Sequence, residues 1–198
     1  MLGVFILQAI GLFIATNIDD IIVLSLFFAR GAGRSGTTAK IIAGQYLGFG
    51  AILATAVIVA LGARSFLPES FITYFGLIPL ALGLRAAWQS WRGKDDDDEE
   101  QVTGKPISVM TVAAVTFANG GDNIGVYVPI FVTVGAVGII AYSGVFLLLV
   151  AGLVLVARYV ATRKPIAATL ERWEHVLFPL VLISLGTFIL VEGGAFGL

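Results

Sequence analysis

The sequence predicts an all-α polytopic membrane protein with six transmembrane helices, arranged as two inverted repeats of three helices each. The first observation is composition: 58% of the 198 residues are hydrophobic, 13% are charged, and the mean hydropathy is +0.98. A soluble domain carries roughly a quarter charged residues, so much of this surface must face lipid. The second observation is a set of six long apolar stretches. The third is a motif that recurs in both halves of the chain.

Each predicted span is long enough to cross about 30 Å of hydrocarbon at the rise of an α-helix. The six spans are 3–28, 39–62, 71–91, 107–133, 138–160 and 175–194. A polar segment, RGKDDDDEEQVTGKP (92–106), separates the third span from the fourth. We therefore predict one membrane domain, made of a first repeat (1–91), an acidic cytoplasmic loop (92–106) and a second repeat (107–198).

The positions of lysine and arginine predict the orientation of these spans. Nearly all basic residues fall in the loops after the first, third and fifth spans, whereas the second loop has only Arg64 and the fourth has none. Basic loops are retained on the cytoplasmic side of a membrane. We expect a multi-pass protein of the cell (plasma) membrane with loops 1, 3 and 5 in the cytoplasm and both termini outside.

The two halves share a polar motif inside an apolar span. With an offset of 103 residues, ATNIDDIIVLSLFF (15–28) lies over ANGGDNIGVYVPIF (118–131), which places Asp19 on Asp122. Three helices in each half would insert the halves in opposite orientations. Many secondary transporters are built this way and bind substrate at the repeat interface near mid-membrane. Chance similarity of apolar segments is the alternative, and the matched acidic residue disfavours it.

Three acidic residues lie deep within the predicted spans. Asp19 and Asp20 fall in the first span and Asp122 falls in the fourth. A carboxylate at that depth costs roughly 2.5–3.5 kcal/mol on insertion scales, so it needs a compensating partner. Gly120 and Gly121 precede Asp122 and should weaken the helix there, and unwound backbone is tolerated at this depth where it lines a site.

Amide side chains accompany these carboxylates and complete a set of oxygen ligands. Carboxylate and amide oxygens suit hard cations, and negative charge disfavours an anion. We therefore expect a metal site, with no resident cofactor, formed by Asp19, Asp20, Asp122, Asn123, Asn119, Asn17 and Gln45. For Gln45, an interhelical hydrogen bond explains the position as well as coordination does. Gly44 and Gly48 flank it at a spacing that permits close helix contact.

Several other classes of function lack the residues they require. No basic stripe with interleaved aromatic residues indicates nucleic acid binding, and no phosphate-binding loop indicates direct use of ATP. No nucleophile–base pair or histidine-rich centre indicates an enzyme. The simplest interpretation of two further features is that they are solvated groups: His175 at a predicted membrane boundary and the acidic run Asp95–Glu100. The expected partners are the metal ion and the lipid bilayer, and the glycine-rich surface permits a homodimer without requiring one.

Four motifs carry a family resemblance along essentially the whole chain. NIDDIIVL (17–24), IAGQYLGFG (42–50), GLIPLALGL (76–84) and NGGDNIGVYVPIF (119–131) resemble the cadmium-resistance transporter family of the lysine-exporter superfamily. The resemblance implies secondary export of divalent metal cations, Cd²⁺ and/or Zn²⁺. It also implies site roles for the matching positions, which are Asp19, Gln45, Asp122 and Asn123.

The substrate and the coupling ion leave alternatives open. Members of the family can carry a thiol just ahead of the Asp122–Asn123 pair, where this chain has no cysteine. Cadmium prefers soft ligands, so an all-oxygen site keeps Mn²⁺ or Ca²⁺ as an alternative. Export of an organic cation, such as a quaternary ammonium or a basic amino acid, is a further alternative that would favour an aromatic-lined cavity. A carboxylate holds either a proton or a metal, which makes proton antiport the expected coupling.

Overall fold

The computed structural model describes residues 2–92, 107–163, 176, 179–191 and 193–195. Within these ranges the chain is helical and contains no strand, as the sequence predicts. His175 and nearly all of the predicted acidic loop, residues 93–106, lie outside the described residues.

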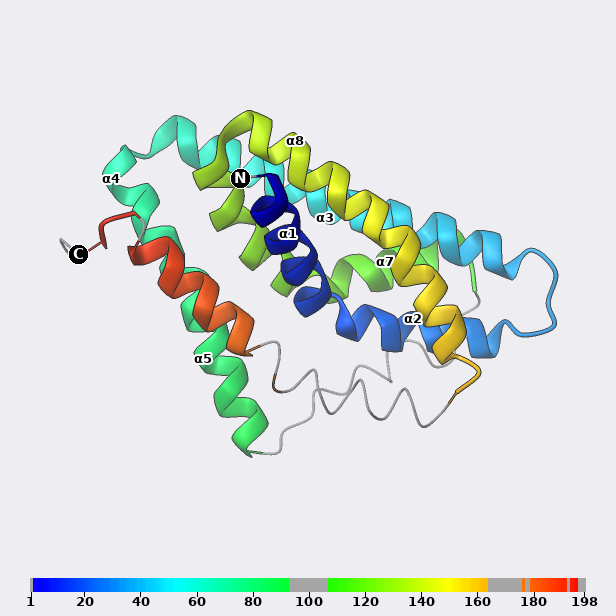
Figure 1. Cartoon of the computed structure of the whole chain (residues 1–198). Coiled ribbons are helices and arrows are strands. Elements are labelled where there is room, and N and C mark those ends of the chain that lie inside the picture. The colour runs from blue at the N-terminus through cyan, green and yellow to red at the C-terminus, as the bar shows by residue number, and fades with distance from the viewer. Residues whose placement is uncertain (1, 93–106, 164–175, 177–178, 192, 196–198) are drawn as a thin grey trace.

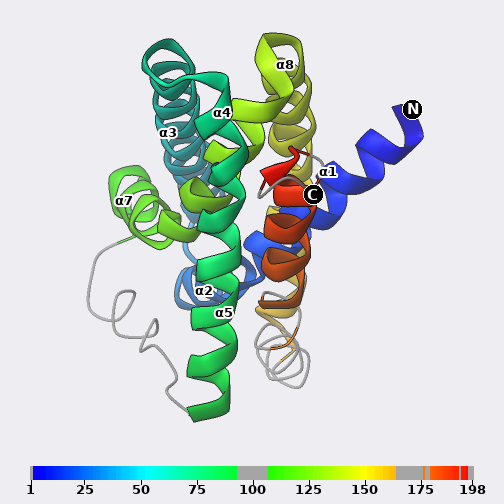
Figure 2. The same cartoon turned by 90° about the vertical axis from the view of Figure 1, so that its left-hand side faces the viewer.

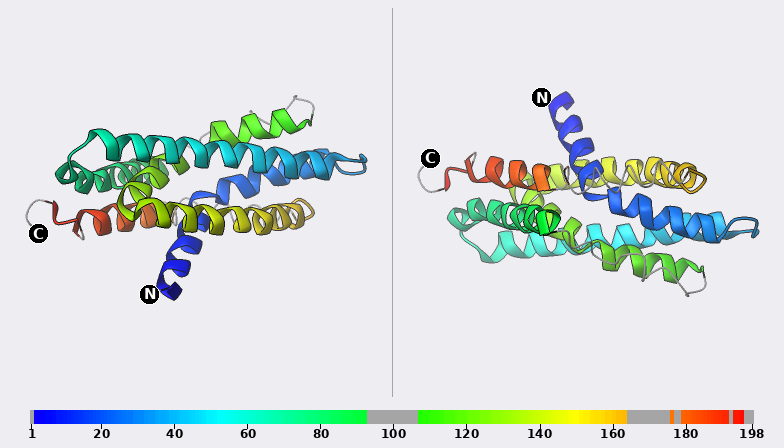
Figure 3. Two further views of the ribbon diagram at one scale, coloured as in Figure 1. Left: turned by 90° about the horizontal axis from the view of Figure 1, so that it is seen from above. Right: turned by 90° about the horizontal axis from the view of Figure 1, so that it is seen from below.

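The first predicted span is broken into two helices. Helix α1 (Leu2–Thr16) is followed by α2 (Ile18–Arg30), and the two are bent by 56° at Asn17. The prediction of one unbroken helix over 3–28 is therefore wrong. The Asn17 side chain donates a hydrogen bond to the Phe13 carbonyl at 2.8 Å, the local bonding by which asparagine competes with helical structure. Figure 3 shows α1 standing away from the axis of the other helices.

The second predicted span is a single long helix and the third is composite. Helix α3 (Thr37–Phe66) has 30 residues and spans about 45 Å at 1.5 Å per residue. After it come α4 (Glu69–Ile72), the 3₁₀ turn η1 (Thr73–Gly76) and α5 (Leu77–Arg92). These three elements follow one another directly and cover the region predicted as the third span, 71–91.

Glycines bring α5 against the last described helix, Pro179–Val191, and Figure 2 shows the two side by side. A Cβ atom added to Gly83 would lie 2.8 Å from the Ile183 nitrogen, and one added to Gly186 would lie 2.5 Å from the Leu80 nitrogen. The two backbones are therefore in direct contact, which a larger residue at either glycine would prevent.

The glycines of the second motif interrupt the fourth predicted span as expected. Helix α7 (Val109–Asn119) ends before Gly120, and α8 (Gly121–Val160) begins after it. Within α8, Gly135 has φ 71° and ψ −178°, a conformation that L side chains rarely adopt.

The backbone at Gly135 reverses the chain. The rings of Tyr127 and Phe146 have centroids 4.8 Å apart, whereas an unbroken helix would separate residues nineteen apart by about 28 Å. Figure 1 shows α8 turning back on itself there. The reversal falls between the predicted spans 107–133 and 138–160.

Among the described residues, α3 and α8 are long and apolar enough to cross a membrane, and the bent pair α1–α2 makes a third such element. Helix α7 and the helix Pro179–Val191 are apolar but shorter. The fold is thus that of a helical membrane protein. The arrangement as six spans in two inverted repeats stays a prediction.

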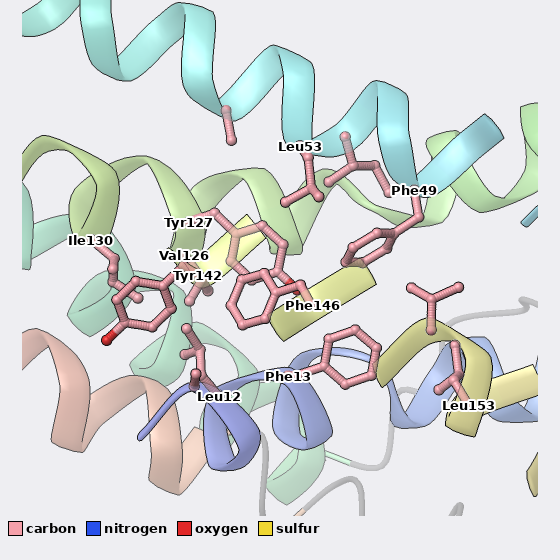
Figure 4. Close-up of a cluster of buried hydrophobic side chains, with 14 of the residues drawn as sticks. Leu12, Phe13, Phe49, Leu53, Val126, Tyr127, Ile130, Tyr142, Phe146 and Leu153 are labelled. Carbon is pink, nitrogen blue, oxygen red and sulfur yellow. The ribbon is translucent and has the colours of Figure 1, made fainter. Parts of the chain in front are cut away.

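The core lies where α1, α3 and the two arms of α8 meet, and Figure 4 shows its aromatic centre. Phe49, Tyr127 and Phe146 are each fully buried there. Large apolar side chains also cover the outside: Leu148 is 77% exposed and Ile58 is 71% exposed. An apolar exterior around a packed interior is the arrangement that lipid requires.

Candidate metal-binding site

The polar residues of the interior gather at the two helix breaks. The break between α1 and α2 falls at Asn17, and the break between α7 and α8 falls at Gly120. The 103-residue offset between the motifs places these two positions on one another. Both breaks therefore occur at the same point of the repeated motif.

Asp20 is a buried carboxylate held by two amides. Its side chain is 2% exposed. Its Oδ2 accepts a hydrogen bond from Gln45 Nε2 at 3.0 Å, and its Oδ1 accepts one from Asn119 Nδ2 at 3.1 Å. The same Asn119 nitrogen donates to Asp19 Oδ2 at 2.6 Å. One amide nitrogen thus joins both acidic side chains, which we call the carboxylate pair (Asp19 and Asp20).

The orientation of Gln45 is fixed from its other side. Its Oε1 accepts a hydrogen bond from Thr116 Oγ1 at 2.6 Å, so its amide nitrogen is directed to Asp20. Helix α3 can place Gln45 here because Gly44 and Gly48 lie against α7. A Cβ added to Gly48 would be 2.7 Å from the Ala113 carbonyl oxygen. The close helix contact predicted for these glycines is confirmed, and Gln45 makes an interhelical hydrogen bond.

A second set of buried side chains surrounds Asn17. Its Nδ2 lies 2.9 Å from Thr16 Oγ1 and 3.1 Å from Tyr127 Oη, and it donates to both. Thr16 Oγ1 and Tyr127 Oη are themselves 3.0 Å apart. Asn123 Nδ2 donates to Asn17 Oδ1 at 3.4 Å, while Asn123 Oδ1 is buried with no hydrogen-bond partner within the described structure.

These two sets differ in charge. The carboxylate pair brings two acidic groups, and the amides of Gln45 and Asn119 that donate to it are neutral, so they orient the carboxylates without neutralising them. The set around Asn17 consists of hydroxyl and amide groups. Together they present the oxygen donors that a divalent cation binds in proteins.

The structure brings together most of the residues that the sequence predicts for this site. Asp19, Asp20, Gln45 and Asn119 belong to the first set, and Asn17 and Asn123 belong to the second; we call the two sets together the polar network. Asp122 lies in the first turn of α8, and its side chain is exposed. In the described part of the chain, no group of three or more histidine, cysteine or acidic side chains is placed to hold a metal.

Three side chains belong to the site beyond the predicted set, and the first is Thr16, whose hydroxyl accepts a hydrogen bond from Asn17 Nδ2 at 2.9 Å. Thr116 orients Gln45, and Tyr127 bonds to Thr16 and Asn17. Helical spacing marks both, since Thr116 precedes Asn119 by three residues and Tyr127 follows Asn123 by four.

A buried carboxylate held by amides at breaks between apolar helices is typical of one class of protein, the membrane transporters of cations. The chain belongs to the cadmium resistance transporter family, whose sequence profile matches residues 13–198. Membership makes the chain a membrane transporter of the cadmium-resistance type. Neither the curated proteins nor the solved structures contain a match to it.

Proposed function

We propose that this protein is a secondary transporter that exports divalent metal cations, Cd²⁺ and/or Zn²⁺, from the cytoplasm in exchange for protons. The transported ion binds between Asp19 and Asp20. The amide oxygens of Asn119, Asn17 and Asn123 serve as further ligands. The observation that carries this proposal is Asp20, a buried acidic side chain held between two helices by neutral amides. Such groups inside a membrane are expensive and mark ion pathways.

Export of a divalent ion requires an energy source. Moving two charges outward against 100 mV, inside negative, costs about 4.6 kcal/mol, at ~2.3 kcal/mol per charge. Inward protons supply this energy if they bind the same groups that release the metal. The carboxylate pair meets that requirement, because each carboxylate holds either a share of the metal or a proton.

The two breaks support an exchange mechanism based on the repeats. They fall in register at Asn17 and Gly120, and each has polar side chains beside it. In transporters built from inverted repeats, one half rocks against the other around a site at their interface. Asp122, exposed on the first turn of α8, serves as an entry ligand that passes the ion to the carboxylate pair.

A harder divalent cation, Mn²⁺ or Ca²⁺, is the second candidate substrate. The chain contains no cysteine, and the network offers oxygen atoms from carboxylate, amide and hydroxyl groups. Oxygen ligands favour hard cations, and cadmium gains most from sulfur.

Metal uptake by everted membrane vesicles tests this function. We expect uptake of at least one ion among Cd²⁺, Zn²⁺, Mn²⁺ and Ca²⁺, with collapse of the proton gradient reducing it to background. Asp20→Asn should abolish uptake because it removes a buried negative charge from the site. Asp98→Asn, in the acidic run outside the described residues, is the matched control and should transport as the parent does.

Each part of the proposal has a result that would contradict it. Uptake that ignores the proton gradient would remove the antiport mechanism. Competition by a quaternary ammonium ion at the concentrations at which metals compete would favour the organic cation. Normal uptake by Asp20→Asn would remove the carboxylate pair from the transport site.

A further inference from the structure

Aromatic residues lie one helical turn beyond the polar network on three separate segments. Phe13 precedes Asn17 by four residues, Phe49 follows Gln45 by four, and Tyr127 follows Asn123 by four. Residues four apart lie on the same face of a helix, so the network is followed by ring side chains on α1, α3 and the first arm of α8. This pattern repeats on elements that are remote in sequence.

A fourth ring from the returning arm of α8 closes the set. Centroid distances are 5.6 Å for Phe13–Phe49, 6.3 Å for Phe49–Tyr127, 4.8 Å for Tyr127–Phe146 and 5.8 Å for Phe146–Phe13. Each ring thus contacts the next around a closed circuit, which Figure 4 shows at the centre of the core. All four side chains are at most 3% exposed. We call these four residues the aromatic layer.

The aromatic layer lies directly against the polar network. The ring of Tyr127 belongs to the layer, while its hydroxyl is 3.0 Å from Thr16 Oγ1 and 3.1 Å from Asn17 Nδ2. A hydrated ion cannot pass between rings packed at these distances. An ion leaving the network on this side would therefore require the layer to part, as in hydrophobic constrictions that gate channels.

The predicted orientation places this layer on the outer side. From the network, the layer lies toward the N-terminal end of α1 and toward the reversal at Gly135. Both are expected outside, because the fourth loop has no basic residue and the second loop has only Arg64, which lies beside Gly135. On the opposite side the network is less enclosed, since Asp19 and Asn119 are only half-buried.

We propose that the aromatic layer is the outer gate of the transport pathway, closed in this structure, and that Tyr127 links the gate to the site. The inference rests on the proposed function for the existence of a pathway. It adds the residues that separate the site from the exterior. When Thr16 and Asn17 move with a bound ion, the Tyr127 hydroxyl moves with them and its ring leaves the circuit with Phe49 and Phe146.

Thiol accessibility tests the gate without depending on transport. The chain has no cysteine, so Thr16→Cys introduces its single thiol directly behind the layer. A charged, membrane-impermeant methanethiosulfonate is applied to intact cells. Ala136→Cys, beside the reversal at Gly135, and Ser35→Cys, in the loop after α2, are both exposed and report the outer and inner sides.

With the layer intact, we expect the thiol of Thr16→Cys to stay unmodified from outside and to react fully after denaturation. Adding Phe146→Ala should raise its labelling rate by about tenfold or more, because the rate follows the fraction of molecules with an open layer. Phe188→Ala, on a half-exposed ring of the last helix, is the matched control and should leave the rate unchanged. Phe146→Leu, which keeps more of the volume, replaces Phe146→Ala if the latter fails to reach the membrane.

Three results would overturn the gate. The first is rapid external labelling of Thr16→Cys with the layer intact. The second is an unchanged labelling rate of Thr16→Cys when Phe146 is replaced. The third is external labelling of Ser35→Cys, which would place the layer on the cytoplasmic side. None of these results bears on whether Asp20 is required for metal uptake. Loss of uptake in Asp20→Asn with an unchanged labelling pattern would leave both proposals standing.

Discussion

Gln45 shows how a single buried amide can set the geometry of a carboxylate. It is fully buried, its amide oxygen accepts a hydrogen bond from Thr116, and its amide nitrogen donates one to Asp20. Because an amide has a donor end and an acceptor end, the hydroxyl of Thr116 determines that the nitrogen faces the carboxylate. The position of Asp20 therefore depends on Thr116 through the Gln45 amide.

This dependence leads to a prediction for Thr116→Val. The substitution keeps the shape of the side chain but leaves the buried Gln45 oxygen without that donor, which should lower the free energy of unfolding by about 1–3 kcal/mol. Thermal unfolding in detergent measures the change. We also expect slower metal uptake, since the Gln45 amide is then free to turn away from Asp20.

The control for this change is Thr55→Val, another threonine-to-valine substitution on a helix. Thr55 is half-buried, and its hydroxyl donates an exposed hydrogen bond to the Ala51 carbonyl at 2.8 Å. Its loss should alter stability by no more than about 0.5 kcal/mol. Equal effects at Thr55 and Thr116 would show that the hydrogen bond to Gln45 has no special weight.

At the scale of elements, the breaks in the helices decide what the site contains. A straight helix over the first motif would place Thr16, Asp19 and Asp20 on one face. The break at Asn17 instead directs Thr16 to Tyr127, while Asp19 and Asp20 meet Asn119. The second break, at Gly120, leaves Asn119 at the end of α7 and Asp122 on the exposed first turn of α8.

The contact between α3 and α7 provides a prediction at this scale. A Cβ on Gly48 would lie 2.7 Å from both the Ala113 carbonyl oxygen and Thr116 Cβ, and the first of these is backbone. Gly48→Ala must therefore separate the helices, and we expect it to destabilise the fold by about 1–3 kcal/mol and to impair uptake. Gly50→Ala, where a Cβ meets nothing within 4 Å, should be neutral or stabilising by up to about 1 kcal/mol.

Thermal unfolding of these two alanine variants gives the comparison directly. If Gly48→Ala unfolds at or above the temperature of Gly50→Ala, the close approach of α3 and α7 does not hold Gln45 in place.

At the scale of the whole molecule, the sequence predicts the class of fold and one of the two helix breaks. It does not predict how the helices are oriented on either side of a break. Hydropathy predicts a helical membrane protein, and the glycines at 120 and 121 predict the second break. The break at Asn17 was not expected, because the first motif has no glycine or proline and the bend depends on a side-chain bond to the Phe13 carbonyl.

The same limit decides which residues of the site could be predicted from the sequence. Spacing along a helix identifies residues that share a face, which is why Asn119, Asp122 and Asn123 were expected together. It does not determine how two helices are rotated at a break. The exposure of Asp122 depends on that rotation at Gly120, and the role of Thr116 depends on the packing of α3 against α7.

The central claim is that the metal ion binds at the carboxylate pair, and that the exposed Asp122 contributes less to its affinity. Calorimetric titration of Cd²⁺ into the purified protein in detergent measures this most directly. We predict that Asp20→Asn weakens binding by about a hundredfold or more, because affinity follows the number of charged ligands, and that Asp122→Asn weakens it by less than about tenfold. Unchanged affinity in Asp20→Asn, or complete loss of binding in Asp122→Asn alone, would contradict the account.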